Sequence, residues 1–286
     1  MKPGPEYFER QYNNRLSIPN ADDYDTRGVE RSRATRARLR GHLDLAYGST
    51  SRERIDLFPA ARANAPIMSF IHGGFWRARD KSEFTYIAEP FVAEGITVAL
   101  VEYDLVPAVT VEVIVTQMLA AHAWLYRHAG QYGADPSRLF VVGHSAGGHL
   151  AAMMAAADWA DYTPDGRPLH LPANMIKGTY ALSGLFDLEP LLNISFNAQI
   201  GLDSESAKCT SPITYRPRLP VPLRTAVGAL ESDEFKRQSR LIAERWPHCV
   251  KGHMEVPGTN HLAMAEVLAD PQSELHQSVR TMVLAR

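Results

Sequence analysis

The stretch Leu139-Phe140-Val141-Val142-Gly143-His144-Ser145-Ala146-Gly147-Gly148-His149-Leu150-Ala151-Ala152-Met153-Met154 decides the fold of this chain. An apolar run of strand length leads into a G-x-S-x-G pattern, which is followed by a segment rich in Ala, Met and Leu. The order predicts a strand, a sharp turn and a helix. Because such a tight turn strains its central residue and leaves no room for flanking side chains, we expect Ser145 to stand above the carboxyl end of a sheet.

This position gives Ser145 the surroundings of a nucleophile. The first turn of a helix has unpaired N–H groups and the positive end of the helix dipole, both of which stabilise an oxyanion that forms beside the serine. The N–H of Ala146 is the first candidate donor. Short glycine and serine patterns also occur by chance in loops, so the rest of the chain has to supply a base, an acid and a second donor.

A second glycine motif lies upstream of the serine. The apolar run 66–71 predicts a buried strand that ends in His72-Gly73-Gly74-Phe75-Trp76. Adjacent glycines let the backbone approach a substrate closely, so Gly73 and Gly74 are the candidates for the other half of an oxyanion hole. We expect Phe75 and Trp76 to line the substrate pocket, with burial in the core as the alternative.

Strands and helices alternate along most of the chain. This order predicts an α/β protein with a mostly parallel central sheet and helices on both faces, in one domain that spans residues 1–286. Residues 1–45 are expected to form an N-terminal extension, an irregular start followed by an arginine-rich helix whose solvated face could also contact a second copy in a homodimer. The proline-rich region 186–220 is expected to cover the pocket. The expected strands are 54–58, 66–71, 96–101, 139–143, 177–184, 223–230 and 250–256, and the expected helices are 82–93, 111–131, 146–154 and 235–245, with one or two more after 262.

The composition excludes several classes of protein. The chain has 45% hydrophobic and 22% charged residues and a formal net charge of −2, so we expect it to bind neither nucleic acid nor an anionic membrane. The two cysteines, Cys209 and Cys249, form no disulfide framework and no metal-ligand spacing, which is typical of a reducing cytoplasm. We find no apolar signal core and no segment that could span a bilayer, and we expect neither a metal nor an organic cofactor.

The base and the acid come from the last third of the chain. Of the 11 histidines, His261 lies in a loop after the last expected strand, from which it can reach the serine hydroxyl. The acid is expected in the loop after the preceding strand, where Glu231 and Asp233 are both candidates. We favour Glu231, because it is closest to the end of the strand and has the longer side chain.

These motifs together resemble the α/β-hydrolase superfamily, and within it the kynurenine formamidase (arylformamidase) group, which is itself similar to hormone-sensitive-lipase-type esterases. The resemblance covers most of the chain. Where the animal formamidases have the triad aspartate, four positions before the phenylalanine that matches Phe235, this chain has Glu231, so the alignment also favours this residue. The matching segments are Tyr7-Phe8-Glu9-Arg10-Gln11-Tyr12, the two glycine motifs, Ser183-Gly184-Leu185-Phe186-Asp187-Leu188-Glu189-Pro190, Glu234-Phe235-Lys236-Arg237-Gln238-Ser239 and Asn260-His261.

The resemblance implies a serine hydrolase that forms an acyl-enzyme on Ser145, with His261 as the base. Its implied substrate is an aryl formamide such as N-formylkynurenine, and Phe75, Trp76 and Phe186 are the side chains expected to stack on the aryl ring. One alternative is a general short-chain carboxylesterase, which uses the same machinery. The other is a hydrolase-fold binding protein without catalysis, which usually lacks one member of the triad.

Overall fold

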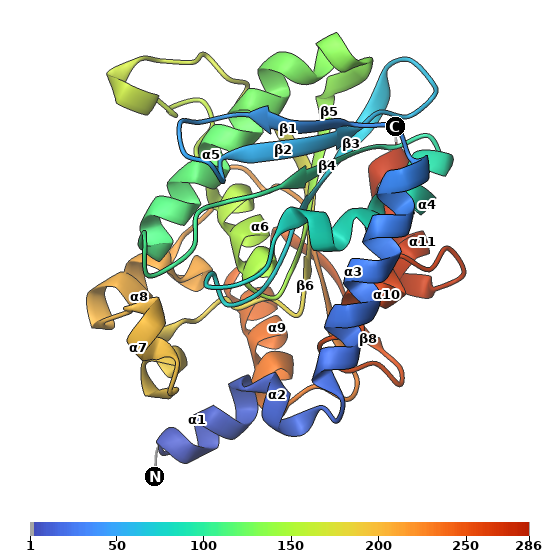
Figure 1. The fold of residues 1–286 in the computed structure, drawn as a ribbon. Coiled ribbons are helices and arrows are strands. Elements are labelled where there is room, and N and C mark those ends of the chain that lie inside the picture. Colours follow the sequence, from blue (N-terminus) through green and yellow to red (C-terminus); the bar gives the residue numbers. More distant parts are fainter. Residues whose placement is uncertain (1–2, 286) are drawn as a thin grey trace.

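A computed structural model describes residues 3–285 of the chain, and its centre is an eight-stranded sheet (Figure 1). The order of the strands across the sheet is β1-β2-β4-β3-β5-β6-β7-β8. Strand β2 pairs antiparallel with both β1 and β4, and every pair from β4 to β8 is parallel. The strands are β1 (His42–Ala46), β2 (Arg54–Phe58), β3 (Ala65–Ile71), β4 (Thr97–Val101), β5 (Ala134–His144), β6 (Ile176–Leu182), β7 (Leu223–Gly228) and β8 (Val250–Val256).

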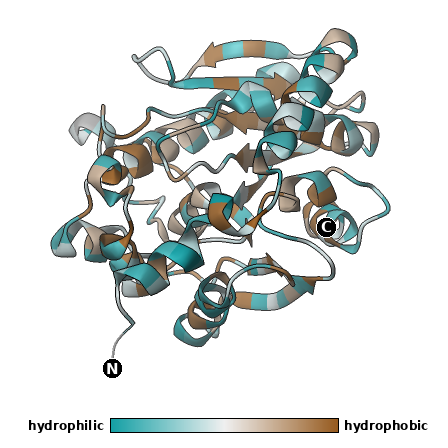
Figure 2. Ribbon diagram, turned by 60° about the horizontal axis from the view of Figure 1, so that its bottom comes forward, coloured by the Kyte–Doolittle hydropathy of each residue, from teal (hydrophilic) through white to brown (hydrophobic). Residues whose placement is uncertain are grey.

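Helices cover both faces of this sheet, as the alternation of strands and helices predicts. In β3, Ile67 and Ile71 belong to one hydrophobic core, whereas Met68 and Phe70 belong to another, because successive side chains of a strand point to opposite faces. The first core contains residues of α5, α6 and α9, and the second contains residues of α4, α10 and α11. In Figure 2 hydrophobic residues gather in the inner strands, and hydrophilic stretches appear on the surrounding helices. The predicted fold class is therefore confirmed. The helices are α1 (Pro5–Tyr12), α2 (Asn14–Ser17), α3 (Ala21–Arg38), α4 (Ala88–Ala93), α5 (Val111–His128), α6 (Ala146–Ala156), α7 (Asn197–Ile200), α8 (Ser204–Thr210), α9 (Asp233–Arg245), α10 (Met264–Leu268) and α11 (Glu274–Leu284).

The N-terminal region differs from the expected irregular start and single helix. It forms three helices, and strand β1 follows within the segment that we expected to be helical. The strand has a weak sequence signal because it lies at the edge of the sheet and leaves side chains such as Leu43 exposed. Several arginines of α3 are also paired with carboxylates instead of facing only solvent: Arg27 contacts Glu266, and Arg38 contacts Glu89.

The carboxyl ends of the parallel strands position the chemistry of this chain. Ser145 follows β5 directly, Ser183 follows β6, Glu231 comes three residues after β7, and His261 lies in the loop after β8. The His72-Gly73-Gly74 segment follows β3, the neighbour of β5. Since the ends of parallel strands meet at one edge of a sheet, these five segments come together. Among residues 3–285, none of the helices combines the length and the apolar character needed to cross a membrane.

Candidate active site

Ser145 occupies a strained turn between β5 and α6. Its backbone angles are φ 58° and ψ −118°, which non-glycine residues rarely adopt. The turn is tight enough that a Cβ on Gly147 would lie 2.0 Å from the carbonyl oxygen of Ile71, and one on Gly143 would lie 2.0 Å from the oxygen of Gly147. The glycines of the motif are therefore required by close backbone contacts, and they place the serine side chain in the position that the sequence predicts.

The side chain of His261 reaches this serine. Its Nε2 atom lies 3.0 Å from Oγ of Ser145, and both residues are about 3% exposed. The preceding Asn260 fixes the loop, because its Oδ1 accepts hydrogen bonds from the N–H groups of Leu262 and Ala263. The Nδ2 of Asn260 also donates to the hydroxyl of Tyr24 on α3. These contacts hold the loop that carries the imidazole of His261.

Glu231, and not Asp233, contacts the imidazole. Its Oε2 atom lies 2.6 Å from Nδ1 of His261, while its Oε1 atom accepts hydrogen bonds from the N–H of Gly228 and the Oγ of Ser183, both at 2.6 Å. Asp233 is exposed in the first turn of α9. Strand β7 ends at Gly228, two residues earlier than expected, and the N–H of Glu231 closes a turn on the carbonyl of Gly228. This turn brings the carboxylate of Glu231 next to Nδ1 of His261.

The two loops that carry Glu231 and His261 are joined by their backbones. The N–H of Leu230 donates to the carbonyl of Thr259 at 3.0 Å, and a Cβ on Gly228 would lie only 2.2 Å from the same oxygen. The distance between acid and base is therefore set by main-chain contacts, which restrict both loops to one arrangement.

The backbone around Gly73 and Gly74 lies against the serine, as an oxyanion hole requires. A Cβ on Gly73 would be 2.9 Å from Cβ of Ser145, and Gly74 has a φ of +106°, a region open mainly to glycine. On the other side of the serine, Ala146 is the first residue of α6, so its N–H has no partner within the helix. Gly73, in the loop after β3, and Ala146, at the start of α6, both lie next to Ser145.

His72 fixes the loop that contains these glycines. Its Nδ1 donates to the carbonyl of Gly73 at 2.8 Å, and its Nε2 lies 2.9 Å from Oε1 of Glu102. The ring stacks on Tyr103 with centroids 4.5 Å apart, and the Tyr103 hydroxyl donates to the carbonyl of His72. Both ring nitrogens therefore hold structural contacts.

His144 supports the base. Its Nε2 donates to the backbone carbonyl of His261 at 2.9 Å, and the two rings lie 4.8 Å apart. Burial, with a smaller contribution from the neighbouring His261, holds the pKa of His144 well below its usual value. The ring is therefore neutral near pH 7, and one of its nitrogens is a donor while the other remains an acceptor.

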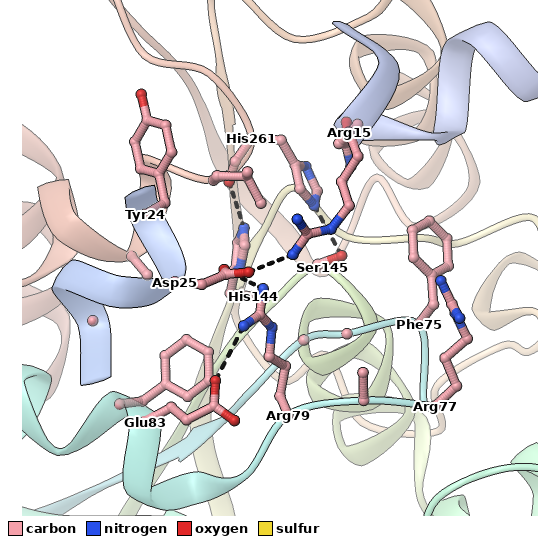
Figure 3. A pocket seen from close by; sticks show the side chains of 18 of the residues that line it. Arg15, Tyr24, Asp25, Phe75, Arg77, Arg79, Glu83, His144, Ser145 and His261 are labelled. Atoms are coloured by element: carbon pink, nitrogen blue, oxygen red, sulfur yellow. Dashed lines mark hydrogen bonds and ion pairs between the residues drawn. The ribbon is translucent and has the colours of Figure 1, made fainter. Parts of the chain in front are cut away.

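A cavity of about 340 Å³ opens above Ser145 and His261 (Figure 3). It has an aromatic wall and a charged wall, a combination that suits a ligand with both an apolar ring and polar groups. The residues that line it include Arg15, Tyr24, Asp25, Gly73, Gly74, Phe75, Arg77, Arg79, Glu83, Phe84, Tyr86, His144, Phe196 and Leu262.

Two of the three aromatic residues expected in the pocket do not line this cavity. Trp76 and Phe186 are both fully buried, and only Phe75 faces the cavity. The ring of Trp76 packs on His149 with centroids 5.0 Å apart, and the backbone has a positive φ at both Phe75 and Trp76. Phe186 lies beneath Gly184 in the core instead. The second aromatic side chain of the wall is Phe196, whose ring centroid is 4.6 Å from that of Phe75.

The N-terminal region, which carries no expected site residue, supplies Arg15 and Asp25 of the charged wall. Arg15 pairs with Asp25, Asp25 also pairs with Arg79, and Arg79 pairs with Glu83 at 3.1 Å. Of the segment 186–220, which we expected to cover the pocket, Phe196 is the residue that lines the cavity. The sequence signal for the N-terminal contribution is weak, because these residues are polar and lie far along the chain from Ser145. Ser183 was also missed as a partner of Glu231, although the Ser183-Gly184 pair lies at the expected end of the adjacent strand.

Among residues 3–285, no group of three or more His, Cys, Asp or Glu side chains is arranged to hold a metal ion. In the same residues, Cys209 and Cys249 are both free, one exposed and one buried.

Comparison with known proteins places this geometry in a family context. The BD-FAE family matches residues 55–215. The kynurenine formamidase of Salmo salar is 31% identical over 268 residues, which cover 90% of this chain and 85% of the salmon protein. The kynurenine formamidase of Danio rerio is 29% identical over 265 residues, with 90% and 85% of the two chains covered.

Among solved structures, a protein from Silicibacter sp. TM1040, provisionally named a thioesterase, superposes with a TM-score of 0.81. It is 30% identical to this chain, and the match covers 97% of this chain and 99% of the other. The similarity thus includes the N-terminal helices that contribute to the cavity, as well as the sheet.

Proposed function

Because the chain belongs to the BD-FAE family and to the kynurenine formamidase family of α/β-hydrolases, and is a serine hydrolase, we propose that it removes the formyl group from aryl formamides such as N-formylkynurenine. The observation that carries the proposal is the unbroken row of contacts from Glu231 through His261 to Ser145, at 2.6 Å and 3.0 Å. The length of the match to the formamidases supports the substrate class.

In the proposed first step, Ser145 attacks the formyl carbon. Nδ1–H of His261 donates to Glu231, which leaves Nε2 free to accept the hydroxyl proton as the Oγ–C bond forms. The carbonyl oxygen becomes an oxyanion, and the N–H of Ala146 and the backbone of Gly73 and Gly74 stabilise it. Hydrogen bonds that strengthen as the charge develops lower the barrier without holding the substrate itself more tightly.

The tetrahedral intermediate then collapses and the C–N bond breaks, which completes the acylation half of the reaction. Nε2–H of His261 gives its proton to the leaving aryl amine, and a formyl ester remains on Ser145. A water molecule then gives a proton to His261 and attacks the ester, and the same histidine returns this proton to Oγ as formate leaves. Each half uses the same base and the same oxyanion donors, and the reaction consumes one water.

A short-chain ester or thioester hydrolase is the second candidate, because the Silicibacter protein matches nearly the whole chain. The same nucleophile and base would act, with an alcohol or thiol in place of the amine as leaving group. The replacement of the formamidase aspartate by Glu231 also distinguishes this chain from the animal enzymes to which it is similar.

The experiment is a comparison of kcat/KM for N-formylkynurenine, formanilide and p-nitrophenyl acetate, with Ser145→Ala as the control. A clear preference for the formamides supports the proposal, whereas a preference for the acetate ester favours the second candidate. Labelling of Ser145 by an organophosphonate tests the third alternative, a binding protein without catalysis. If folded protein is neither labelled nor active on any of the three substrates, the proposed triad is wrong.

A further inference from the structure

Arg77 is set apart from the other charged groups of the cavity. Arg15 pairs with Asp22 and Asp25, and Arg79 pairs with Asp25 and Glu83. Glu266, at the rim, pairs with Arg27. Within the described part of the chain, Arg77 is the cation of the cavity wall that has no carboxylate within 4.0 Å. Its guanidinium donates to the neutral side-chain oxygen of Gln199 at 2.7 Å.

The position of Arg77 is fixed by the loop that passes the nucleophile. The N–H of Arg77 closes a turn on the carbonyl of Gly74, and the carbonyl of Trp76 accepts from the N–H of Val106 at 2.9 Å. The backbone of Arg77 is thus anchored to the same loop whose glycine backbone lies against Ser145. Because the backbone is anchored, the guanidinium can move only by rotation about its side-chain bonds, and this rotation lets it adapt to a ligand in the cavity.

Arg77 belongs to the aromatic wall. Its guanidinium lies over the ring of Phe196 at 5.0 Å from the centroid, and Phe196 contacts Phe75 edge to face. In Figure 3 Phe75 and Arg77 lie on one side of Ser145, and the chain of ion pairs from Asp25 through Arg79 to Glu83 lies on the other. A ligand whose ring packs on Phe75 therefore meets one positive charge that no protein carboxylate neutralises.

We infer that Arg77 binds a carboxylate on the leaving group and so selects, among aryl formamides and aryl esters, those whose ring carries a side chain with a carboxylate group. The inference rests on the proposed attack of Ser145 on an aryl substrate. Guanidinium groups bind carboxylates through two parallel hydrogen bonds. Nη1 of Arg77 donates to Gln199, and the stack on Phe196 leaves Nε and Nη2 to donate to a carboxylate. Because Arg77 is exposed at the mouth of the cavity, solvent weakens this contact, and its contribution to kcat/KM is about five- to tenfold.

The test uses substrates that differ only in charge. Kinetic constants are measured for ortho-formamidophenylpropanoate and ortho-formamidophenylpropanamide, and for the matching pair of acetate esters, ortho-acetoxyphenylpropanoate and ortho-acetoxyphenylpropanamide. The wild-type protein is expected to prefer the carboxylate of each pair by about five- to tenfold, through a lower KM at similar kcat, and to lose most of this preference in 0.5 M salt.

Three variants separate a contact with the substrate from a structural role. Arg77→Gln is expected to reduce the preference to about onefold, chiefly by raising KM for the carboxylate substrates, and Arg77→Lys is expected to keep part of the preference. Arg240→Gln removes one positive charge from an exposed position on α9 and should leave the preference unchanged.

Two results would overturn the inference: a wild-type protein that does not distinguish the members of either pair, or an Arg77→Gln variant that loses activity equally on both. The ester pair keeps this result separate from the proposed function. If both formamides are inert but the charged ester is preferred in an Arg77-dependent way, the formamidase proposal fails and the carboxylate site stands.

Discussion

Replacement of Glu231 by glutamine tests the assigned acid and the direction of its hydrogen bonds. In the structure, Oε1 of Glu231 accepts from the backbone N–H of Gly228 and from Ser183, while Oε2 faces Nδ1 of His261 at 2.6 Å. The N–H of Gly228 can only donate, so the amide oxygen of the glutamine has to remain at the Oε1 position. Its NH2 group then faces His261.

This orientation imposes the wrong tautomer on the base. An NH2 group donates to Nδ1, so the proton of the neutral imidazole moves to Nε2, which can then no longer accept the proton of Ser145. The variant also lacks the negative charge that stabilises the imidazolium. From the known effect of an equivalent change in serine proteases, we expect kcat/KM to fall by about 10³- to 10⁴-fold, or about 4 to 5.5 kcal/mol in transition-state stabilisation.

The assay is hydrolysis of the best substrate of the panel, with thermal unfolding measured in parallel to show that the variant is folded. Asp233→Asn is the matched control, because this neighbouring carboxylate is exposed and should change kcat/KM by less than about twofold. Glu231→Asp keeps the charge but shortens the side chain, and we expect an intermediate loss. If Glu231→Gln retains more than a tenth of the activity, or if Asp233→Asn shows the large loss, the assignment is refuted.

Three further predictions concern a partner of Glu231, a glycine of the serine turn and a buried histidine. Ser183→Ala removes one hydrogen bond to Glu231 and should lower kcat/KM by about tenfold; an unchanged value would show that this contact is dispensable. Gly147→Ala places a methyl group 2.0 Å from the oxygen of Ile71, and urea unfolding should show destabilisation by about 3 kcal/mol or failure to fold; native-like stability would contradict this backbone contact. Burial lowers the pKa of His122 from 6.5 to about 4, so the unfolded chain takes up the proton first, and this residue alone should lower the free energy of unfolding by about 3 kcal/mol as pH drops from 6.5 to 4. His122→Gln should reduce the dependence of the unfolding free energy on pH, and an equal dependence in the variant would contradict the lowered pKa of His122.

The sequence alone determined the fold class and the position of the serine. Both depend on local patterns: an apolar run followed by G-x-S-x-G and a helix-forming segment leaves the chain few ways to continue, because the glycines at 143 and 147 admit only one close approach of strand and helix. The order of strand ends along the chain then indicated His72-Gly73-Gly74 and His261. The sequence also limited the acid to Glu231 or Asp233, and the structure shows that Glu231 holds the contact with the base.

Only the tertiary structure decided which side chains face the cavity. Glu231 is selected by the N–H of Gly228 and by Ser183 from the neighbouring strand, contacts that a loop of unknown conformation does not reveal. Trp76 is buried in the core and its neighbour Phe75 faces the cavity, although both residues have a positive φ.

The N-terminal region shows the same limit most clearly. Arg15 and Asp25 both line the cavity and pair with each other, and Asp25 also pairs with Arg79, which is distant in sequence. Polar side chains of this kind follow no hydrophobic periodicity, so the sequence provides no pattern that reports where they lie. Their placement depends on how α3 packs beside the sheet, and this packing is a property of the whole fold.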